Sequence, residues 1–203
     1  MRICVIGGFS SFAKRGMIQS WLSLASKDKP GVKVTVLLNG DDDFITGTSL
    51  VDDLDVQVEL FAEGCFCCTL RDALTETLIE ERDVRRPDQL LMSASVIADL
   101  GQVEGLIRQV MGEEIEVLSI FSLDLENAAA IIDSFAEMVE RNVRSADAVM
   151  LIGEGDLFEN EANQVISKLK GMNATLRDKR AADVQGKRAI FLVIVGSEFP
   201  WFP

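Results

Sequence analysis

The stretch Val34-Thr35-Val36-Leu37-Leu38 is apolar at every position except Thr35 and does not alternate with polar residues. Two further stretches have the same character: Leu90-Leu91-Met92 and the unbroken apolar run Ala189–Val195. Continuous apolar runs are typical of parallel strands covered by helices on both faces, whereas strands with one wet face alternate. The sequence therefore predicts an α/β protein with a doubly wound, mainly parallel sheet.

Apolar runs of this kind recur along the chain, with amphipathic segments between them. We expect strands at 3–6, 32–38, 56–60, 90–94, 117–123, 148–152 and 190–195, and helices near 15–26, 70–82, 98–111, 125–142 and 160–171. This alternation predicts a single three-layer α/β/α domain over residues 1–195. Residues 196–203 contain two prolines and three aromatics, and we expect them to form a tail that docks on the domain itself, with docking on a partner as the alternative. One long loop, Asn39–Asp55, is expected, and such loops are often functional.

Composition excludes several classes of function. The 203 residues are 48% hydrophobic and carry a formal net charge of −13, so the surface should repel nucleic acid and anionic lipid. The chain has no histidine, which removes histidine-dependent catalysis and histidine-containing zinc sites. No apolar stretch approaches the roughly 20 residues of a membrane helix, and no signal segment is visible, so we expect a cytoplasmic protein.

The cysteines point to metal chemistry. Cys65, Cys67 and Cys68 fall within four residues, while Cys4 lies alone in the first apolar run and is expected in the core. Thr69 and Asp72 have the spacing of a capping box, which places the cysteines just before a helix N-terminus that favours thiolates. Three thiolates on one turn suit a thiophilic ion such as Zn²⁺ or Cu(I). With no histidine, a fourth ligand would be water, a carboxylate such as that of Glu63, or a donor from another molecule. The alternative is a set of incidental or redox-labile thiols.

The segment GCFCCTLRDAL at 64–74 resembles the GC-x-CCTLR-x-x-L segment of the CobW-type members of the CobW/HypB/UreG group of P-loop GTPases. Other landmarks agree in order. Met1–Ile18 is similar to the group's first strand and phosphate loop, 34–51 to the stretch after its second strand, 89–99 to its acidic segment, and 146–158 to its base-recognition motif. The resemblance implies a P-loop NTPase-like fold. Members commonly carry a further C-terminal domain, which we do not expect here.

The resemblance assigns a phosphate-binding region that departs from the pattern G-x-x-x-x-G-K-[ST]. The first glycine and the lysine are kept, whereas Ala13 replaces the second glycine and Arg15 replaces the hydroxyl that would ligate Mg²⁺. Ser93 and Gly40 stand where the group has acidic or amide residues. The base-recognition motif keeps only its aspartate. The candidate nucleotide residues are Gly8, Ser10, Ser11, Phe12, Ala13, Lys14, Arg15 and Asp156; Lys14 and Asp156 can equally be read as an ordinary helix-start lysine and a turn residue.

Three functions follow as hypotheses. The first is a metallochaperone-like protein that captures an ion with the three cysteines and passes it to a client protein or to a second copy, with nucleotide (GTP or ATP) binding weak or absent. The second is a divergent GTPase or ATPase, coupled to metal insertion or cobalamin-related metabolism, whose Mg²⁺ site is completed by Asp41–Asp43 or Asp99. The third is a structural pseudo-GTPase that pairs with an active relative. Neither nucleic acid nor a membrane is expected as a partner.

Overall fold

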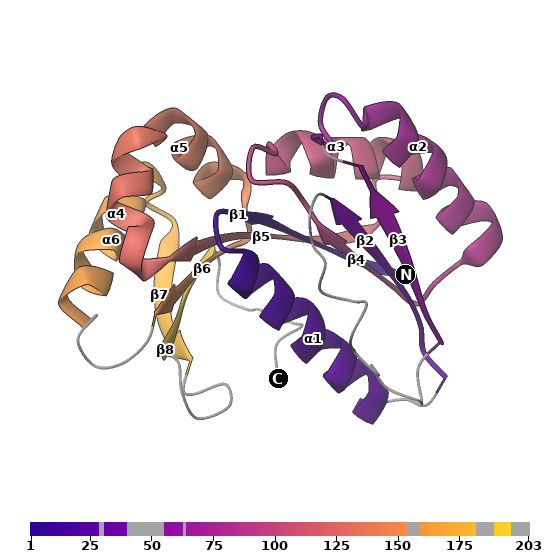
Figure 1. The fold of residues 1–203 in the computed structure, drawn as a ribbon, viewed down its shortest axis with the longest axis horizontal. Helices are drawn as coiled ribbons and strands as arrows, with labels where there is room; N and C mark the ends of the chain where they lie inside the picture. Colours follow the sequence, from indigo (N-terminus) through magenta and orange to yellow (C-terminus); the bar gives the residue numbers. More distant parts are fainter. Residues whose placement is uncertain (29–30, 40–54, 63, 154–158, 182–188, 196–203) are drawn as a thin grey trace.

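A computed structural model describes residues 1–28, 31–39, 55–62, 64–153, 159–181 and 189–195 (Figure 1). The strands are β1 (Arg2–Gly8), β2 (Lys33–Asn39), β3 (Asp55–Phe61), β4 (Gln89–Ser93), β5 (Glu116–Asp124), β6 (Ala148–Gly153), β7 (Leu176–Ala181) and β8 (Ala189–Val195). The helices are α1 (Ser11–Asp28), α2 (Arg71–Glu80), α3 (Leu100–Met111), α4 (Leu125–Ser134), α5 (Ala136–Ser145) and α6 (Glu159–Met172). The expected 39–55 loop and the expected tail lie almost wholly outside the described residues.

The strands form one sheet in the order β3-β2-β4-β1-β5-β6-β8-β7. The first six strands in this order pair in parallel, and β8 pairs antiparallel with β6 on one side and β7 on the other. The predicted α/β class with a mainly parallel sheet is therefore confirmed. β1 lies near the middle of the sheet, between β4 and β5, so the segment after β1 emerges at the centre of the carboxyl edge.

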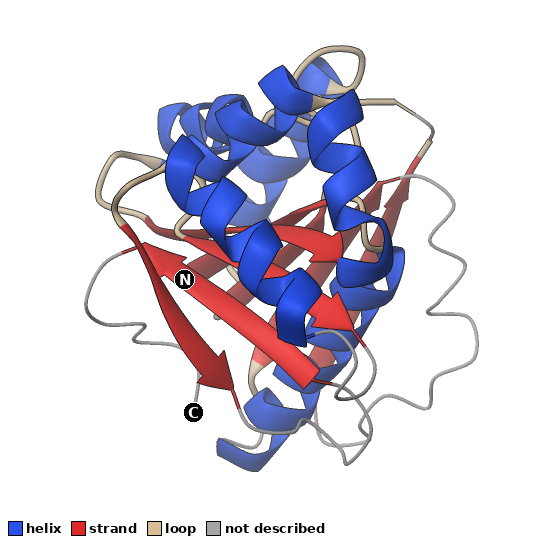
Figure 2. Ribbon diagram, turned by 90° about the vertical axis from the view of Figure 1, so that its left-hand side faces the viewer, coloured by secondary structure: helices blue, strands red, loops and turns tan. Residues whose placement is uncertain are grey.

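Helices cover the two faces of the sheet unequally (Figures 1 and 2). α1 lies on one face, where it buries Ala13, Met17, Ile18 and Leu22 against the sheet. The other face carries α2 to α6, whose apolar residues join a larger core. Cys4 of β1 is 1% exposed and belongs to the core on the α1 side, as its sequence context predicted. Within the described ranges no helix combines the length and apolarity needed to cross a membrane.

Three local features differ from the sequence prediction. β7 was not predicted because its sequence, LRDKRA, is largely polar and its place in the sheet comes from pairing with β8. The single helix predicted over 125–142 is two helices, α4 and α5, because Phe135 leaves helical geometry at φ −128° and ψ 37°. The Phe135 ring packs instead on that of Phe9, with their centroids 5.5 Å apart. α2 continues into an unpredicted π-helical turn, Glu81–Arg85.

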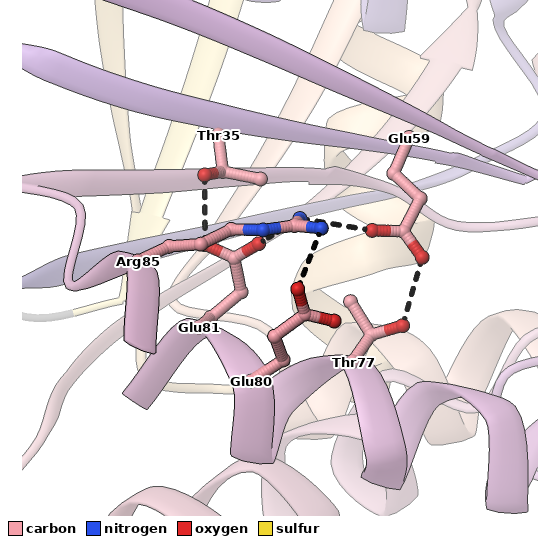
Figure 3. A network of polar contacts seen from close by, with 6 residues as sticks. All are labelled: Thr35, Glu59, Thr77, Glu80, Glu81 and Arg85. Atoms are coloured by element: carbon pink, nitrogen blue, oxygen red, sulfur yellow. Dashed lines mark hydrogen bonds and ion pairs between the residues drawn. The ribbon is translucent and has the colours of Figure 1, made fainter. Parts of the chain in front are cut away.

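A polar network joins this π-helical turn to β2 and β3 (Figure 3). The Arg85 guanidinium lies 2.7 Å from a carboxylate oxygen of Glu81, 3.2 Å from one of Glu59 and 3.0 Å from one of Glu80. The Glu81 side chain is fully buried and also accepts a hydrogen bond from the Thr35 hydroxyl at 2.8 Å. A buried carboxylate needs both a cation and hydrogen-bond donors, and Arg85 with Thr35 provides them. The network fixes the far end of α2 to the edge of the sheet.

Replacing Arg85 by methionine is expected to lower the free energy of unfolding by about 3 kcal/mol, because Glu81 then stays buried without its cation. Urea unfolding measures this difference. Arg144→Met is the matched control: Arg144 pairs with Glu140 on the surface with 62% of its side chain exposed, and such pairs contribute under about 0.5 kcal/mol. Equal losses in the two variants would contradict the assigned role of Arg85.

Candidate metal site and the region of the expected phosphate loop

The three clustered cysteines lie on a tight turn between the end of β3 and the start of α2. The backbone N–H groups of Cys68 and Leu70 both donate to the carbonyl oxygen of Cys65, at 3.1 and 3.0 Å. This folding of the chain brings the sulfurs of Cys65, Cys67 and Cys68 within 4.8 Å of one another. Three sulfurs at this separation can ligate a single ion after small side-chain rotations. The predicted clustering of the thiols in space therefore agrees with the structure.

Two features of the neighbouring chain hold this turn in place. Gly64 has φ +151°, and a Cβ atom there would lie 2.5 Å from the Thr69 hydroxyl oxygen and 3.0 Å from Leu70 Cγ, so the position excludes a side chain. Phe66 is fully buried, and its ring packs edge-on against that of Phe61 with centroids 5.0 Å apart. The turn is thus anchored in the core between two of its cysteines.

The predicted capping box at Thr69 is wrong. Leu70 occupies the N-cap position of α2 without a side-chain hydrogen bond to the helix. The Thr69 hydroxyl instead accepts a hydrogen bond from the backbone N–H of Cys65 at 2.9 Å. The same oxygen that would cap the helix is used to close the cysteine turn, because the chain reverses between Cys65 and Thr69. Thr69 therefore supports the thiol site rather than the helix.

The cysteines differ in burial and acidity. Cys65 is 1% exposed, Cys67 is half-buried and Cys68 is exposed. Burial raises the pKa of the Cys65 thiol to about 12, since a low-polarity surrounding disfavours the charged form. The pKa of Cys68 lies below its ordinary value, chiefly because of a backbone hydrogen bond at Thr69. Without a metal, Cys68 is the more readily ionised of these two thiols.

Alkylation of the reduced, metal-free protein should follow this order. At neutral pH iodoacetamide is expected to modify Cys68 at least about 10-fold faster than Cys65 or Cys4, because the thiolate is the nucleophile and both of the latter are buried with raised pKa values. The Cys68 rate should fall as pH is lowered through its pKa, while Cys65 and Cys4 should gain reactivity only at much higher pH. Time-resolved peptide mass spectrometry measures each rate. Preferential labelling of Cys65 would contradict the described turn.

A fourth ligand is not supplied by the described part of the chain. Among the described residues, the grouping of cysteine and carboxylate atoms that could hold an ion consists of the three sulfurs alone. Glu63, the carboxylate suggested by the sequence, lies outside the described residues. A tetrahedral ion bound to these three sulfurs would keep one position for water or for a donor from another molecule.

In the expected phosphate-binding region, α1 begins earlier than predicted. It starts at Ser11, so only Phe9 and Ser10 separate it from β1. Ser11, Phe12, Ala13, Lys14 and Arg15 form its first turn, with Ala13 and Lys14 buried and the other three exposed. The Ser10 hydroxyl accepts from the backbone N–H of Ala13 at 2.9 Å and donates to the Asp124 carboxylate at 2.6 Å. A backbone N–H that could face an anion is thereby already paired.

Side chains from this region bridge both sides of the β1 carboxyl end. Toward β4, the Lys14 amine donates to the carbonyl oxygen of Ala94 at 3.1 Å. Toward β5, Ser10 bonds to Asp124, and Gly8 packs directly on the Ser122 backbone. Open α/β sheets bind ligands at this edge, in the crevices where neighbouring connections leave on opposite faces. Here the Lys14 and Ser10 side chains form hydrogen bonds to both neighbouring strand ends at this edge.

The remaining candidate residues divide into two groups. Asp156, Gly40 and Asp41–Asp43 lie outside the described residues. Asp99 caps α3 by accepting from the backbone N–H of Gln102 at 3.1 Å, and it pairs with Arg141 at 2.8 Å. These contacts engage both carboxylate oxygens in joining the start of α3 to α5, which is a structural role. Asp124 was not predicted as a site residue; its position directly after the strand expected at 117–123 was the signal available.

The parallel sheet and the central β1 followed directly by a helix define an α/β protein of the P-loop NTPase type, and three clustered cysteines precede α2. The sequence model of the CobW/HypB/UreG nucleotide-binding domain matches residues 2–181. The chain belongs to this family.

Comparison with solved structures agrees on the fold. The chain is similar to the Zn(II)-bound YjiA GTPase from E. coli, with a TM-score of 0.54 and 17% sequence identity over 84% of this chain and 54% of that one. This chain thus spans about half the length of YjiA. A glutamine-N5 methyltransferase from Alicyclobacillus acidocaldarius also matches over 90% of both chains at 13% identity, but its TM-score of 0.28 carries no structural argument. A comparison with curated proteins finds no match.

Proposed function

We propose that this chain is a metallochaperone-like protein that binds Zn²⁺, or another thiophilic ion, through Cys65, Cys67 and Cys68. The observation that carries the proposal is the convergence of three sulfurs within 4.8 Å on a turn held by Gly64, Thr69 and Phe66. Soft sulfur ligands select soft or borderline ions over Mg²⁺ and Ca²⁺. A cytoplasmic location would keep these thiols reduced and able to bind.

The exposure of the site favours transfer over permanent storage. The sulfur of Cys68 faces solvent while Cys65 is anchored in the core, so an acceptor can approach the ion from the Cys68 side. A client protein, or a second copy of this chain, that offers a fourth donor can then displace the three sulfurs one at a time. This stepwise exchange avoids an intermediate in which the ion has no protein ligand.

Nucleotide binding plays at most a minor part in the proposed function. The residues at the expected phosphate site do not fit a Mg²⁺-nucleotide: Lys14 is engaged with Ala94, Ser10 with Asp124, and Arg15 stands where a hydroxyl ligand is needed. Membership of a nucleotide-binding family favours the second candidate, a GTPase or ATPase coupled to metal insertion. Asp41–Asp43, which this candidate offers as Mg²⁺ ligands, lie outside the described residues.

Titration of the reduced protein with Co²⁺, followed by displacement with Zn²⁺, tests the metal site. We expect one ion per chain and an absorption band from thiolate-to-cobalt charge transfer, because the ligands are sulfur. The triple variant Cys65→Ser, Cys67→Ser, Cys68→Ser should lose the band and at least about 1,000-fold in affinity. Cys4→Ala, which alters the cysteine outside the turn, is the control and should bind as the wild type does. Unchanged binding by the triple variant would place the site elsewhere.

A further inference from the structure

Cys65 and Cys68 have the backbone geometry of a disulfide-forming pair. The hydrogen bond from Cys68 N–H to Cys65 C=O, 3.1 Å long, closes a four-residue turn. Such turns hold their first and fourth Cα atoms within about 7 Å, and disulfides bridge Cα atoms about 4.4 to 6.8 Å apart. The sulfurs already lie within 4.8 Å. Closing the bond requires rotation of side chains and little movement of the backbone.

A disulfide between Cys65 and Cys68 is favoured over one between the adjacent residues Cys67 and Cys68. Adjacent Cα atoms across a trans peptide are about 3.8 Å apart, which is shorter than a relaxed disulfide accepts, so Cys67 and Cys68 are poorly placed to bond to each other. A bond between Cys65 and Cys68, the pair that the turn hydrogen bond brings together, leaves Cys67 as the remaining thiol.

The two cysteines are also placed for sequential reaction. Cys68 is exposed, so a dissolved disulfide can reach its sulfur. Cys65 is 1% exposed and packed in the core beside Phe66, so a bulky oxidant cannot reach it directly. Its sulfur is nevertheless within reach of that of Cys68. The order that this arrangement permits is attack of Cys68 on the external disulfide, followed by attack of Cys65 on Cys68 Sγ.

We propose that Cys65 and Cys68 form a reversible disulfide that expels the ion bound by the cysteine turn. The oxidant is a low-molecular-weight disulfide, such as oxidised glutathione. The Cys68 thiolate attacks one of its sulfurs, forming a mixed disulfide and releasing one thiolate; Cys65, which gives up its proton to water when no ion is bound, then attacks Cys68 Sγ as a thiolate and releases the second. Two protein thiolates are oxidised by two electrons, and one external disulfide is reduced to two thiolates.

Expulsion of the ion is the part of this inference that rests on the proposed function. Disulfide sulfurs are not thiolates and bind metal poorly, so the bridge removes two of the three ligands. Cys67 alone cannot retain a Zn²⁺ ion against water and free thiols. Reduction of the bridge restores the site. The oxidation state of the surroundings would thus set how much metal the protein carries.

Treatment of the metal-free, reduced protein with oxidised glutathione tests the disulfide independently of metal. We expect one intramolecular bond per chain, mapped by mass spectrometry to Cys65 and Cys68 and formed equally by Cys67→Ser and Cys4→Ala. Cys65→Ser should instead accumulate glutathione on Cys68, because the resolving thiol is missing, and the exposed-site variant Cys68→Ser should form neither product at an appreciable rate. A bond mapped to Cys67, or glutathione that persists on Cys68 in the wild type, would overturn the assignment.

A second arm uses the Zn²⁺-loaded protein with a colorimetric chelator. We expect one Zn²⁺ released for every two thiols lost, and its rebinding after reduction. Zn²⁺ that stays bound once the disulfide has formed would overturn the release step. Reduced protein that takes up no Zn²⁺ would overturn the proposed function and the release step together, while the disulfide would still be decided by the metal-free protein.

Discussion

Replacing Gly8 by alanine is expected to lower the free energy of unfolding by more than about 4 kcal/mol, a loss that few single substitutions cause. Gly8 has φ +103°, and an added Cβ would lie 2.5 Å from the Ser122 backbone nitrogen and closer still to its carbonyl oxygen. The neighbouring Phe9 N–H donates to that same carbonyl at 2.8 Å, and the Ser122 hydroxyl donates to Gly7 O at 2.8 Å. A methyl group can be admitted only if β1 separates from β5 in the middle of the sheet.

Gly105→Ala is the matched control for this substitution. Gly105 lies in the interior of α3, and a Cβ added there would have no atom within 4 Å, so alanine should raise stability by about 0.5 to 1 kcal/mol through helix propensity. Thermal and urea unfolding of both variants give the comparison. A Gly8→Ala protein as stable as the wild type would contradict the described contact. Gly8 is the first glycine of the expected phosphate loop, and its contact with the Ser122 backbone accounts for a glycine there through the packing of β1 on β5. Phosphate binding is not needed to explain this residue.

Much of the sheet could be predicted from the sequence because its central strands are buried on both faces, and burial demands apolar residues whatever their neighbours are. The expected strand over 117–123 falls within β5, and that over 3–6 within β1. β7 could not be predicted in this way, since its six residues are mostly polar and their strand conformation depends on the partner β8. Phe135, at the break between α4 and α5, contacts the ring of Phe9, and a contact between residues so far apart in the sequence could not be predicted from local pattern.

The candidate metal site likewise has features that could be predicted from the sequence and features that could not. Clustering of the three cysteines is a property of the sequence, and proximity along the chain made their proximity in space foreseeable. The hydrogen bond of the Thr69 hydroxyl could not be predicted, because this oxygen can accept either from a helix N–H or from the Cys65 N–H. The reversal of the chain between Cys65 and Thr69 decides which of the two donors it meets. The gradient from buried Cys65 to exposed Cys68 also depends on the packing of Phe66, which the spacing of the cysteines does not encode.

Nucleotide binding is expected to be weak and insensitive to Mg²⁺, with dissociation constants for GTP and ATP no lower than about 1 mM, or roughly 4 kcal/mol of binding free energy. A phosphate loop binds by presenting several unpaired N–H groups and a lysine to the phosphates. Here α1 starts at Ser11, the Ala13 N–H is paired with Ser10, and Lys14 donates to Ala94 O. The Asp124 carboxylate beside Ser10 adds a negative charge that opposes an incoming phosphate.

Calorimetric titration with GTP, ATP and their diphosphates, with and without Mg²⁺, measures this affinity, and a phosphate-release assay at high protein concentration measures turnover. The repaired variant Ala13→Gly, Arg15→Thr should gain less than about 10-fold in affinity. Restoring a glycine and a hydroxyl leaves Lys14 turned toward Ala94 and Asp124 in place, and Ser93 still offers no carboxylate for a metal that must bridge the β- and γ-phosphates. Sub-micromolar, Mg²⁺-dependent and guanine-selective binding that Lys14→Ala abolishes would contradict this expectation. It would require Lys14 to exchange its carbonyl partner for a phosphate, and it would favour the GTPase candidate over a protein that handles metal alone.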